Sequence, residues 1–205
     1  MPAQSTPRFR PALRALSLAL VLSAAAAVSA AQSPREVAGV RFDGHVQLAG
    51  QDLPLNGVGV RSVAWLKGYA AALYLGQPSS NAEQVVAQSG AKRLQIRMLL
   101  DVPVAEFIKA FHKGVERNTP LAQQASLSER MARFDALVQP LGQVRKGDTV
   151  TLDFMPGQGL LFSHNSRVLG AAIPGEDLYG ALLRCFIGEH PVDDKLKAGL
   201  LGSAT

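Results

Sequence analysis

The residue with the clearest capacity for chemistry is Arg61, which follows two glycines at alternate positions of an apolar stretch. Gly57, Gly59 and Arg61 fall on one face of a predicted strand, because successive strand side chains point in opposite directions. Two glycines beside an arginine leave space on that face. A guanidinium entering this space needs a partner, since an unpaired buried charge is very unfavourable. That partner is either an internal carboxylate or an anionic ligand.

The segment that follows Arg61 predicts a second strand, covered on both faces. From Trp65 to Leu75, the alternate positions on either face are apolar or small. Such a strand lies at the centre of a packed sheet. It places the Tyr69 hydroxyl near Arg61. That hydroxyl either donates a hydrogen bond to a bound carboxylate or belongs to a core aromatic residue with a backbone partner.

Periodicity predicts the remaining elements. Residues 104–115 carry apolar side chains at helical spacing, with Lys109 and Lys113 on the outer face. The other predicted elements are a hairpin of residues 37–42 and 46–48 turning near Asp43–Gly44, a helix at 79–88, a strand at 94–98, a helix opened by Pro120 at its first position, strands at 149–154, 160–162 and 168–173, a helix at 177–187 and a short helix capped by Asp193. Strands and helices are segregated, which predicts an α+β fold with a large antiparallel sheet covered by helices on one face.

Two blocks of the sequence resemble the chalcone isomerase superfamily. The first is G-V-G-V-R-S followed by K-G-Y-A-A-A-L-Y-L, at residues 57–62 and 67–75. The second is L-L-R-C-F-I-G-E-H-P-V-D-D-K-L-K, at residues 182–197, preceded by P-G-E-D, which resembles the secreted bacterial branch. Their order and spacing fit from about residue 37 to residue 201. The resemblance implies an open-faced sandwich with a ligand cleft between sheet and helices.

The resemblance also implies roles for single residues. Arg61 matches an arginine that faces the cleft and holds an anion: a phenolate in the isomerases, a carboxylate in the fatty-acid-binding members. Tyr69, Phe107, Gly114 and Cys185 stand where the isomerases carry a threonine, a tyrosine, an asparagine and a second threonine. Several polar groups that position the reacting hydroxyl and water are therefore absent. An apolar cleft with one charge suits holding an amphipathic acid better than closing a ring.

We therefore predict a non-catalytic binder of a small amphipathic or similar planar acid, such as a fatty acid. Its ligand-binding residues are Arg61, Tyr69, Phe107, Phe111 and Cys185. One alternative is an isomerase of the intramolecular lyase type that acts through Arg61 and Tyr69. The other is a structural or partner-binding module whose cleft is filled by its own side chains. Protein partners cannot be named from the sequence.

No pattern in the sequence predicts a metal or a cofactor. The four histidines, His45, His112, His164 and His190, have no metal-ligand spacing among them. His190 is expected to stabilise the carbonyls at a helix end. Ser163–His164 is not a nucleophile elbow. Cys185 is expected to be a buried small hydrophobe without a neighbouring base.

Residues 1–31 predict a secretory signal peptide. Arg8, Arg10 and Arg14 precede an apolar run from Ala15 to Val28, which small residues follow. Cleavage leaves residues 32–205 as one domain, periplasmic or secreted, without stable membrane insertion. Three of the 21 Lys and Arg residues lie in the signal, so the net charge falls from +5 to +2. This balance, with no basic run, argues against nucleic acid as a partner.

Overall fold

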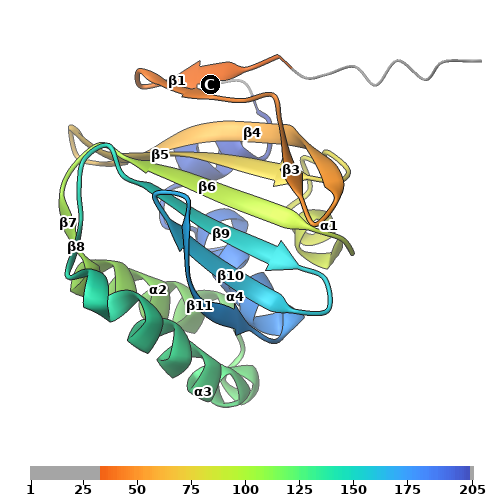
Figure 1. The fold of residues 1–205 in the computed structure, drawn as a ribbon, viewed down its shortest axis with the longest axis vertical. Coiled ribbons are helices and arrows are strands. Elements are labelled where there is room, and N and C mark those ends of the chain that lie inside the picture. Colours follow the sequence, from red (N-terminus) through yellow and green to blue (C-terminus); the bar gives the residue numbers. More distant parts are fainter. Residues whose placement is uncertain (1–32, 204–205) are drawn as a thin grey trace, which may run out of the picture. The chain divides into compact units, whose positions relative to one another are not determined.

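The computed structural model describes residues 33–203, and the predicted signal peptide lies outside these residues. Its centre is a seven-stranded antiparallel sheet with strand order β11-β10-β9-β6-β5-β4-β3 (Figure 1). The strands are β3 His45–Leu48, β4 Gln51–Val63, β5 Leu66–Leu75, β6 Lys92–Met98, β9 Thr149–Met155, β10 Gly159–His164 and β11 Arg167–Ile173. The predicted α+β class with an antiparallel sheet is confirmed.

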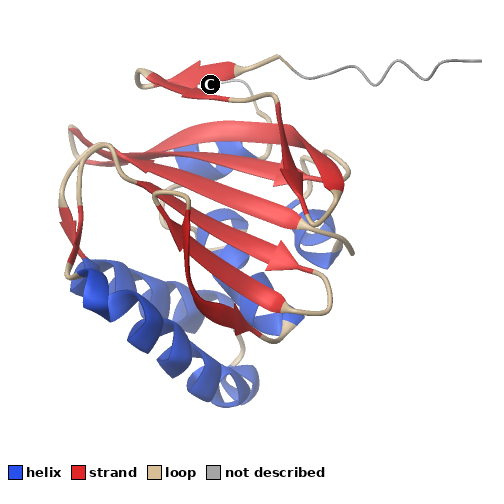
Figure 2. Cartoon of the chain, viewed as in Figure 1, coloured by secondary structure: helices blue, strands red, loops and turns tan. Residues whose placement is uncertain are grey.

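The helices lie on one face of this sheet (Figure 2). They are α1 Ala82–Ala87, α2 Val104–Asn118, α3 Leu121–Val138, α4 Glu176–Ile187 and α5 Asp194–Leu200. Asn81 caps α1 through its side chain, and Asp193 caps α5 in the same way, as predicted for Asp193. Pro120 is the residue before α3 rather than its first helical residue. Within the described chain, no helix is long and apolar enough to cross a membrane.

The main core fills the space between the sheet and the helices. It contains the β5 residues Ala71, Leu73 and Leu75, together with α4, which is buried along most of its length. A smaller cluster on the opposite face of the sheet includes Ala72 and Tyr74 of the same strand. The predicted burial of both faces of this strand is therefore confirmed from residue 70 onwards.

The prediction for the start of β5 was wrong. Ala64 and Trp65 form a two-residue turn between β4 and β5, and the Trp65 side chain is 87% exposed. Ala64 has a positive φ of 53°, which such tight hairpin turns require. Neither residue is a typical turn former, so the apolar pattern alone extended the predicted strand through the turn.

The N-terminal hairpin was also predicted wrongly. Arg35–Val37 (β1) pairs with Val40–Phe42 (β2), while β3 pairs with β4. The turns lie at Ala38–Gly39 and Ala49–Gly50, where all four residues have positive φ. The Asp43–Gly44 dipeptide, a strong hairpin signal, instead joins the two hairpins. The remaining strands, β7 Val102–Pro103 and β8 Gln143–Val144, form a small separate pair, and Gln139–Leu141 is a 3₁₀ turn (η1).

Candidate functional site

The space beside Gly57 and Gly59 is filled by the chain itself. A Cβ atom on Gly57 would lie 2.2 Å from the carbonyl oxygen of Gly199, and one on Gly59 would lie 2.9 Å from that of Leu196. The glycines thus allow α5 to pack backbone to backbone against β4. The expectation that they leave a void for a ligand was wrong at these two positions.

Arg61 lies beyond this contact, at the end of β4. It is directly opposite Tyr69 on β5, so both side chains lie on the helix-covered face. The guanidinium carbon lies 5.8 Å from the centre of the Tyr69 ring. Among residues 33–203, the buried Nε of Arg61 has no hydrogen-bond partner and the side chain forms no ion pair. Asp193 is engaged elsewhere, because it accepts hydrogen bonds from the amides of Ser62 and Leu196.

A cavity of about 310 Å³ opens between the sheet and α2, next to Arg61. The five residues singled out from the sequence, Arg61, Tyr69, Phe107, Phe111 and Cys185, all line it. Its remaining walls are almost entirely apolar and come from several elements; among them are Ile96, Met98, Val138, Val150, Phe162 and Leu182. The arrangement is a mainly apolar chamber with the Arg61 guanidinium at the end of a strand.

Phenylalanines form one wall of the chamber. Phe107 and Phe111 project from successive turns of α2, and their rings lie 6.2 and 5.1 Å from that of Phe134 on α3. Phe134 also contacts Phe162 of β10, with a ring separation of 5.7 Å. Packed aromatic rings hold one another in place, so this wall is preformed.

Gly114 and Cys185 form the contact between α2 and α4. A Cβ atom on Gly114 would lie 2.6 Å from Sγ of Cys185. An asparagine at position 114 therefore has no room unless one of the helices moves. The thiol points to the carbonyl oxygens of Ala181 and Phe111, at 3.3 and 3.8 Å.

The sequence profile described as chalcone isomerase-like matches residues 34–202, nearly all of the described chain. The protein belongs to the chalcone isomerase-like family. Among solved structures, it is similar to the crystal structure of a fatty-acid binding protein from Arabidopsis thaliana. The TM-score is 0.66 at 16% identity, over 82% of this chain and 95% of that chain, which shows the fold alone. No curated protein matches the chain.

The hydroxyl and thiol groups in the cavity of this chalcone isomerase-like protein stay protonated at neutral pH. Burial raises the pKa of Tyr69, although the nearby Arg61 acts in the opposite direction. Burial also raises the pKa of Cys185 to about 12. Neither group supplies an anion at neutral pH, so the polar character of this part of the chamber comes from the Arg61 guanidinium.

Two lysines that line the cavity were not predicted as site residues from the sequence. Lys109 and Lys113 are solvent-exposed, as predicted, yet they also line the cavity from α2, together with Glu106. Their i, i+4 spacing on the polar face of α2 is a usable signal only once the position of the opening is known. The apolar lining from β8, β9 and the 3₁₀ turn was also missed, because those segments read as ordinary core.

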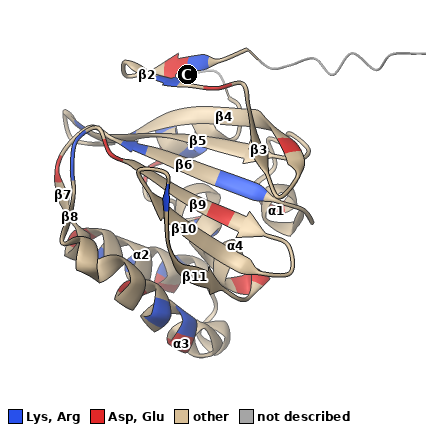
Figure 3. Ribbon diagram, in the orientation of Figure 1, with Lys and Arg blue, Asp and Glu red and all other residues tan. Residues whose placement is uncertain are grey.

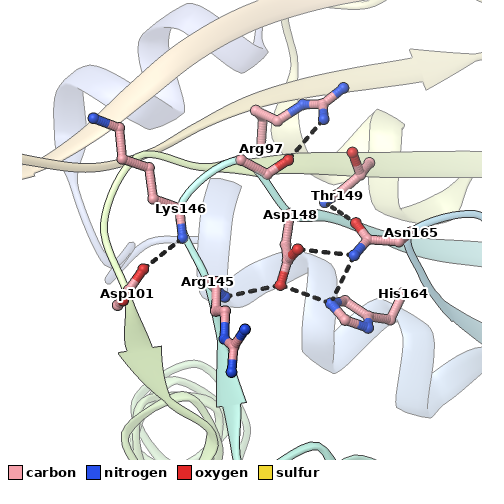
Figure 4. A network of polar contacts seen from close by, with 9 residues as sticks. Arg97, Asp101, Arg145, Lys146, Asp148, Thr149, His164 and Asn165 are labelled. Atoms are coloured by element: carbon pink, nitrogen blue, oxygen red, sulfur yellow. Dashed lines mark hydrogen bonds and ion pairs between the residues drawn. The ribbon is translucent and has the colours of Figure 1, made fainter.

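The histidines do not form a metal site among the described residues. His164 contacts Asp148, which also accepts hydrogen bonds from Asn165 and from the Arg145 amide (Figure 4). His45 and His112 pair separately with Asp52 and Asp135.

The expected helix-end role of His190 was wrong. Lys197 of α5 donates a hydrogen bond to the Gly188 carbonyl at the end of α4, at 2.7 Å. The backbone of His190 is held instead by Asn118.

Proposed function

We propose that this protein binds a small amphipathic acid, such as a fatty acid, with its carboxylate on Arg61 and its tail in the apolar cavity. The observation that carries the proposal is the partially buried guanidinium beside an apolar chamber, whose Nε has no partner in the part of the chain that the structure describes. A carboxylate would supply a charge-assisted hydrogen bond there. The fatty-acid binding protein with the same fold supports this reading, since that protein is named for binding such an acid.

The cavity lining favours a ligand with an apolar body. The tail would contact Phe107 and Phe111, and each buried CH₂ group contributes about 0.8 kcal/mol. The cavity volume of about 310 Å³ is at the lower end of the range of about 300–1,000 Å³ found for small-molecule sites. The dimensions therefore favour a medium-length chain or a compact planar acid.

The lining favours binding without turnover. Phe107 and Gly114 offer no side-chain group that exchanges protons, and the raised pKa values of Tyr69 and Cys185 keep both groups neutral. Positioned general acids and bases contribute roughly 10²–10⁴-fold to a reaction rate. The lining residues that could exchange protons in this way, Glu106, Lys109 and Lys113, are solvent-exposed on α2 rather than at the buried positions next to Arg61.

The export predicted from residues 1–31 belongs to the same proposal. It would place the acid-binding domain in the periplasm or outside the cell.

The experiment is a calorimetric titration of a medium-chain fatty acid and the matching alcohol. Arg61→Ala is expected to weaken binding of the acid by about 2–5 kcal/mol, the usual penalty when a buried charge loses its partner. Binding of the alcohol should change far less. The matched control is Arg41→Ala, which removes an exposed arginine of β2 that does not line the cavity.

Two results would contradict the proposal. One is the absence of acid binding to the wild type across chain lengths. The other is an equal loss for acid and alcohol in Arg61→Ala, which would mean that the guanidinium shapes the cavity without holding the carboxylate. The folding of Arg61→Ala is checked by its thermal transition, because removal of an unpaired buried charge should not destabilise the domain.

A further inference from the structure

The turn between β4 and β5 projects apolar side chains into solvent. Val63, Trp65 and Leu66 are 61%, 87% and 50% exposed, and all three lie in or next to a single tight turn. Trp65 is the only tryptophan of the chain. Leu100, 37% exposed, lies on the neighbouring loop, whose Leu99 amide donates to the Gly68 carbonyl. We call Val63, Ala64, Trp65 and Leu66 the hairpin tip.

The hairpin tip adjoins the residues of β4 and β5 that line the cavity. Arg61 on β4 and Gly68 on β5 both line the cavity, and each is two residues from the tip. At about 3.3 Å per residue, the tip extends roughly 7–10 Å beyond these lining residues. A surface that contacts the tip therefore lies close to the cavity.

Three cations lie next to the hairpin tip or on the loop that is bonded to the end of the neighbouring strand β6. Lys67 adjoins the hairpin tip, and Arg145 and Lys146 lie on the loop packed against the end of β6 (Figure 3). None of these three side chains forms an ion pair within residues 33–203. Carboxylates at this edge offset part of that charge. Asp101 accepts from the Lys146 amide, and Asp148 from Asn165 and the Arg145 amide (Figure 4). Asp193 accepts from the Ser62 amide, next to the tip.

We propose that the hairpin tip docks on a lipid bilayer that carries anionic headgroups, with Trp65 seated in the interfacial region. An indole ring prefers this region, where its apolar body is buried and its N–H stays hydrated. The neighbouring cations match the negative surface, each contributing when it lies within about a Debye length, roughly 10 Å at 0.1 M salt. The contact is peripheral, which agrees with the absence of a membrane-spanning helix among the described residues.

A bilayer suits the shape of the tip better than a protein does. A stable protein complex buries about 800 Å² on each partner. One narrow turn with three large apolar side chains cannot supply that area, whereas it can enter the loosely packed headgroup layer. Docking would bring the cavity lining on β4 and β5 close to the membrane, from which an acid could reach the cavity. That consequence rests on the proposed function, while the docking itself does not.

The test uses the fluorescence of Trp65 in the full-length chain, with no acid added. Because Trp65 is the only tryptophan, its emission reports on the tip whichever other segment touches a vesicle. Vesicles of phosphatidylcholine with about 30% phosphatidylglycerol should shift the emission to shorter wavelength, and lipids brominated near the headgroup should quench it. Pure phosphatidylcholine vesicles should bind more weakly.

Matched variants localise the contact. Val63→Ser with Leu66→Ser keeps Trp65 and should reduce the apparent affinity for anionic vesicles at least tenfold, because it removes two apolar side chains from the interface. Lys67→Gln should reduce it a few-fold on anionic vesicles only. Leu121→Ser is the control, since Leu121 is 84% exposed at the start of α3, away from the cavity lining. Leu121→Ser should leave the apparent affinity for anionic vesicles unchanged.

Three outcomes would overturn the proposal. The first is no shift of Trp65 emission at any lipid concentration. The second is a shift without vesicles that depends on protein concentration, which would mean that a second copy covers the tip. The third is an equal loss of vesicle affinity in Leu121→Ser. Acid binding is measured separately by calorimetry without vesicles, so failure of docking and failure of the proposed function are distinguishable.

Discussion

Arg61 and Arg93 show two ways of placing a guanidinium on the same sheet. Arg93 on β6 donates two hydrogen bonds of 2.7 Å to the buried carboxylate of Asp153 on β9. That pair is complete within the protein. The Arg61 guanidinium instead lies beside the Tyr69 ring, and its buried Nε has no acceptor among residues 33–203. An incomplete site of this kind is what an anionic ligand would complete.

The surface network around Asp148 predicts an acid-dependent loss of stability. Hydrogen bonds from Asn165, from the Arg145 amide and from His164 lower the pKa of Asp148 from 3.8 to about 2. Because the folded pKa is below the unfolded one, this stabilisation is complete above about pH 4 and disappears as the pH falls towards 2. Asp148→Asn should therefore lower the free energy of unfolding at pH 7, by on the order of 1 kcal/mol after solvent screening.

Urea denaturation of wild type and Asp148→Asn between pH 7 and pH 2 tests this expectation. The difference between the two proteins should narrow below pH 4. Asp43→Asn is the control, because Asp43 is exposed and forms no side-chain hydrogen bond within the described chain. A difference that stays constant down to pH 2 would show that the carboxylate charge at position 148 is not what stabilises the loop.

At the level of elements, the contact between β4 and α5 joins distant parts of the chain. Asn56 donates a hydrogen bond of 2.7 Å to the Leu200 carbonyl, across 144 residues. The α5 backbone also lies close to β4 when seen from Gly199, because a Cβ atom on Gly199 would lie 2.3 Å from the Val58 carbonyl oxygen. Glycine is required on both elements for their backbones to come this close.

Gly57→Ala should therefore displace α5. The added methyl group would meet three backbone atoms at 2.2–2.8 Å, and no flexible side chain can move aside. We expect a loss of about 3 kcal/mol or more in the free energy of unfolding, at the upper end of overpacking effects. Hydrogen exchange of the amides in α5 should also accelerate.

Gly68→Ala on β5 is the matched control. Its Cβ atom would have its nearest neighbour at 3.7 Å, an ordinary contact. Comparable destabilisation by the two substitutions would mean that backbone entropy, rather than the β4–α5 contact, sets the requirement for glycine at position 57.

At the scale of the whole molecule, the sheet and its helical layer enclose the cavity, and residues 1–31 precede them. The predicted signal peptide implies that the exported protein begins at Ala31 or Gln32, after the small residues that follow the apolar run. N-terminal sequencing of protein from the periplasmic or secreted fraction tests this. An intact Met1 in that fraction would contradict cleavage.

The α+β class, most helices and strands, and five of the residues that line the cavity could be predicted from the sequence by itself. Helical spacing identified α2 with Phe107 and Phe111, and the strand pattern placed Arg61 beside Tyr69. The family motif added Cys185. These features are local, because periodicity and motif spacing depend on neighbours along the chain. All five residues line one cavity in the structure.

The tertiary structure alone decided which spaces are filled and which surfaces stay exposed. Glycines 57 and 59 predicted room for a ligand, but α5 occupies it, since close packing depends on segments distant in sequence. Trp65 reads as a core residue, yet a turn of atypical composition exposes it. The cavity too is decided by the tertiary structure. Its walls come from several elements, and its volume is the space that their side chains leave unfilled.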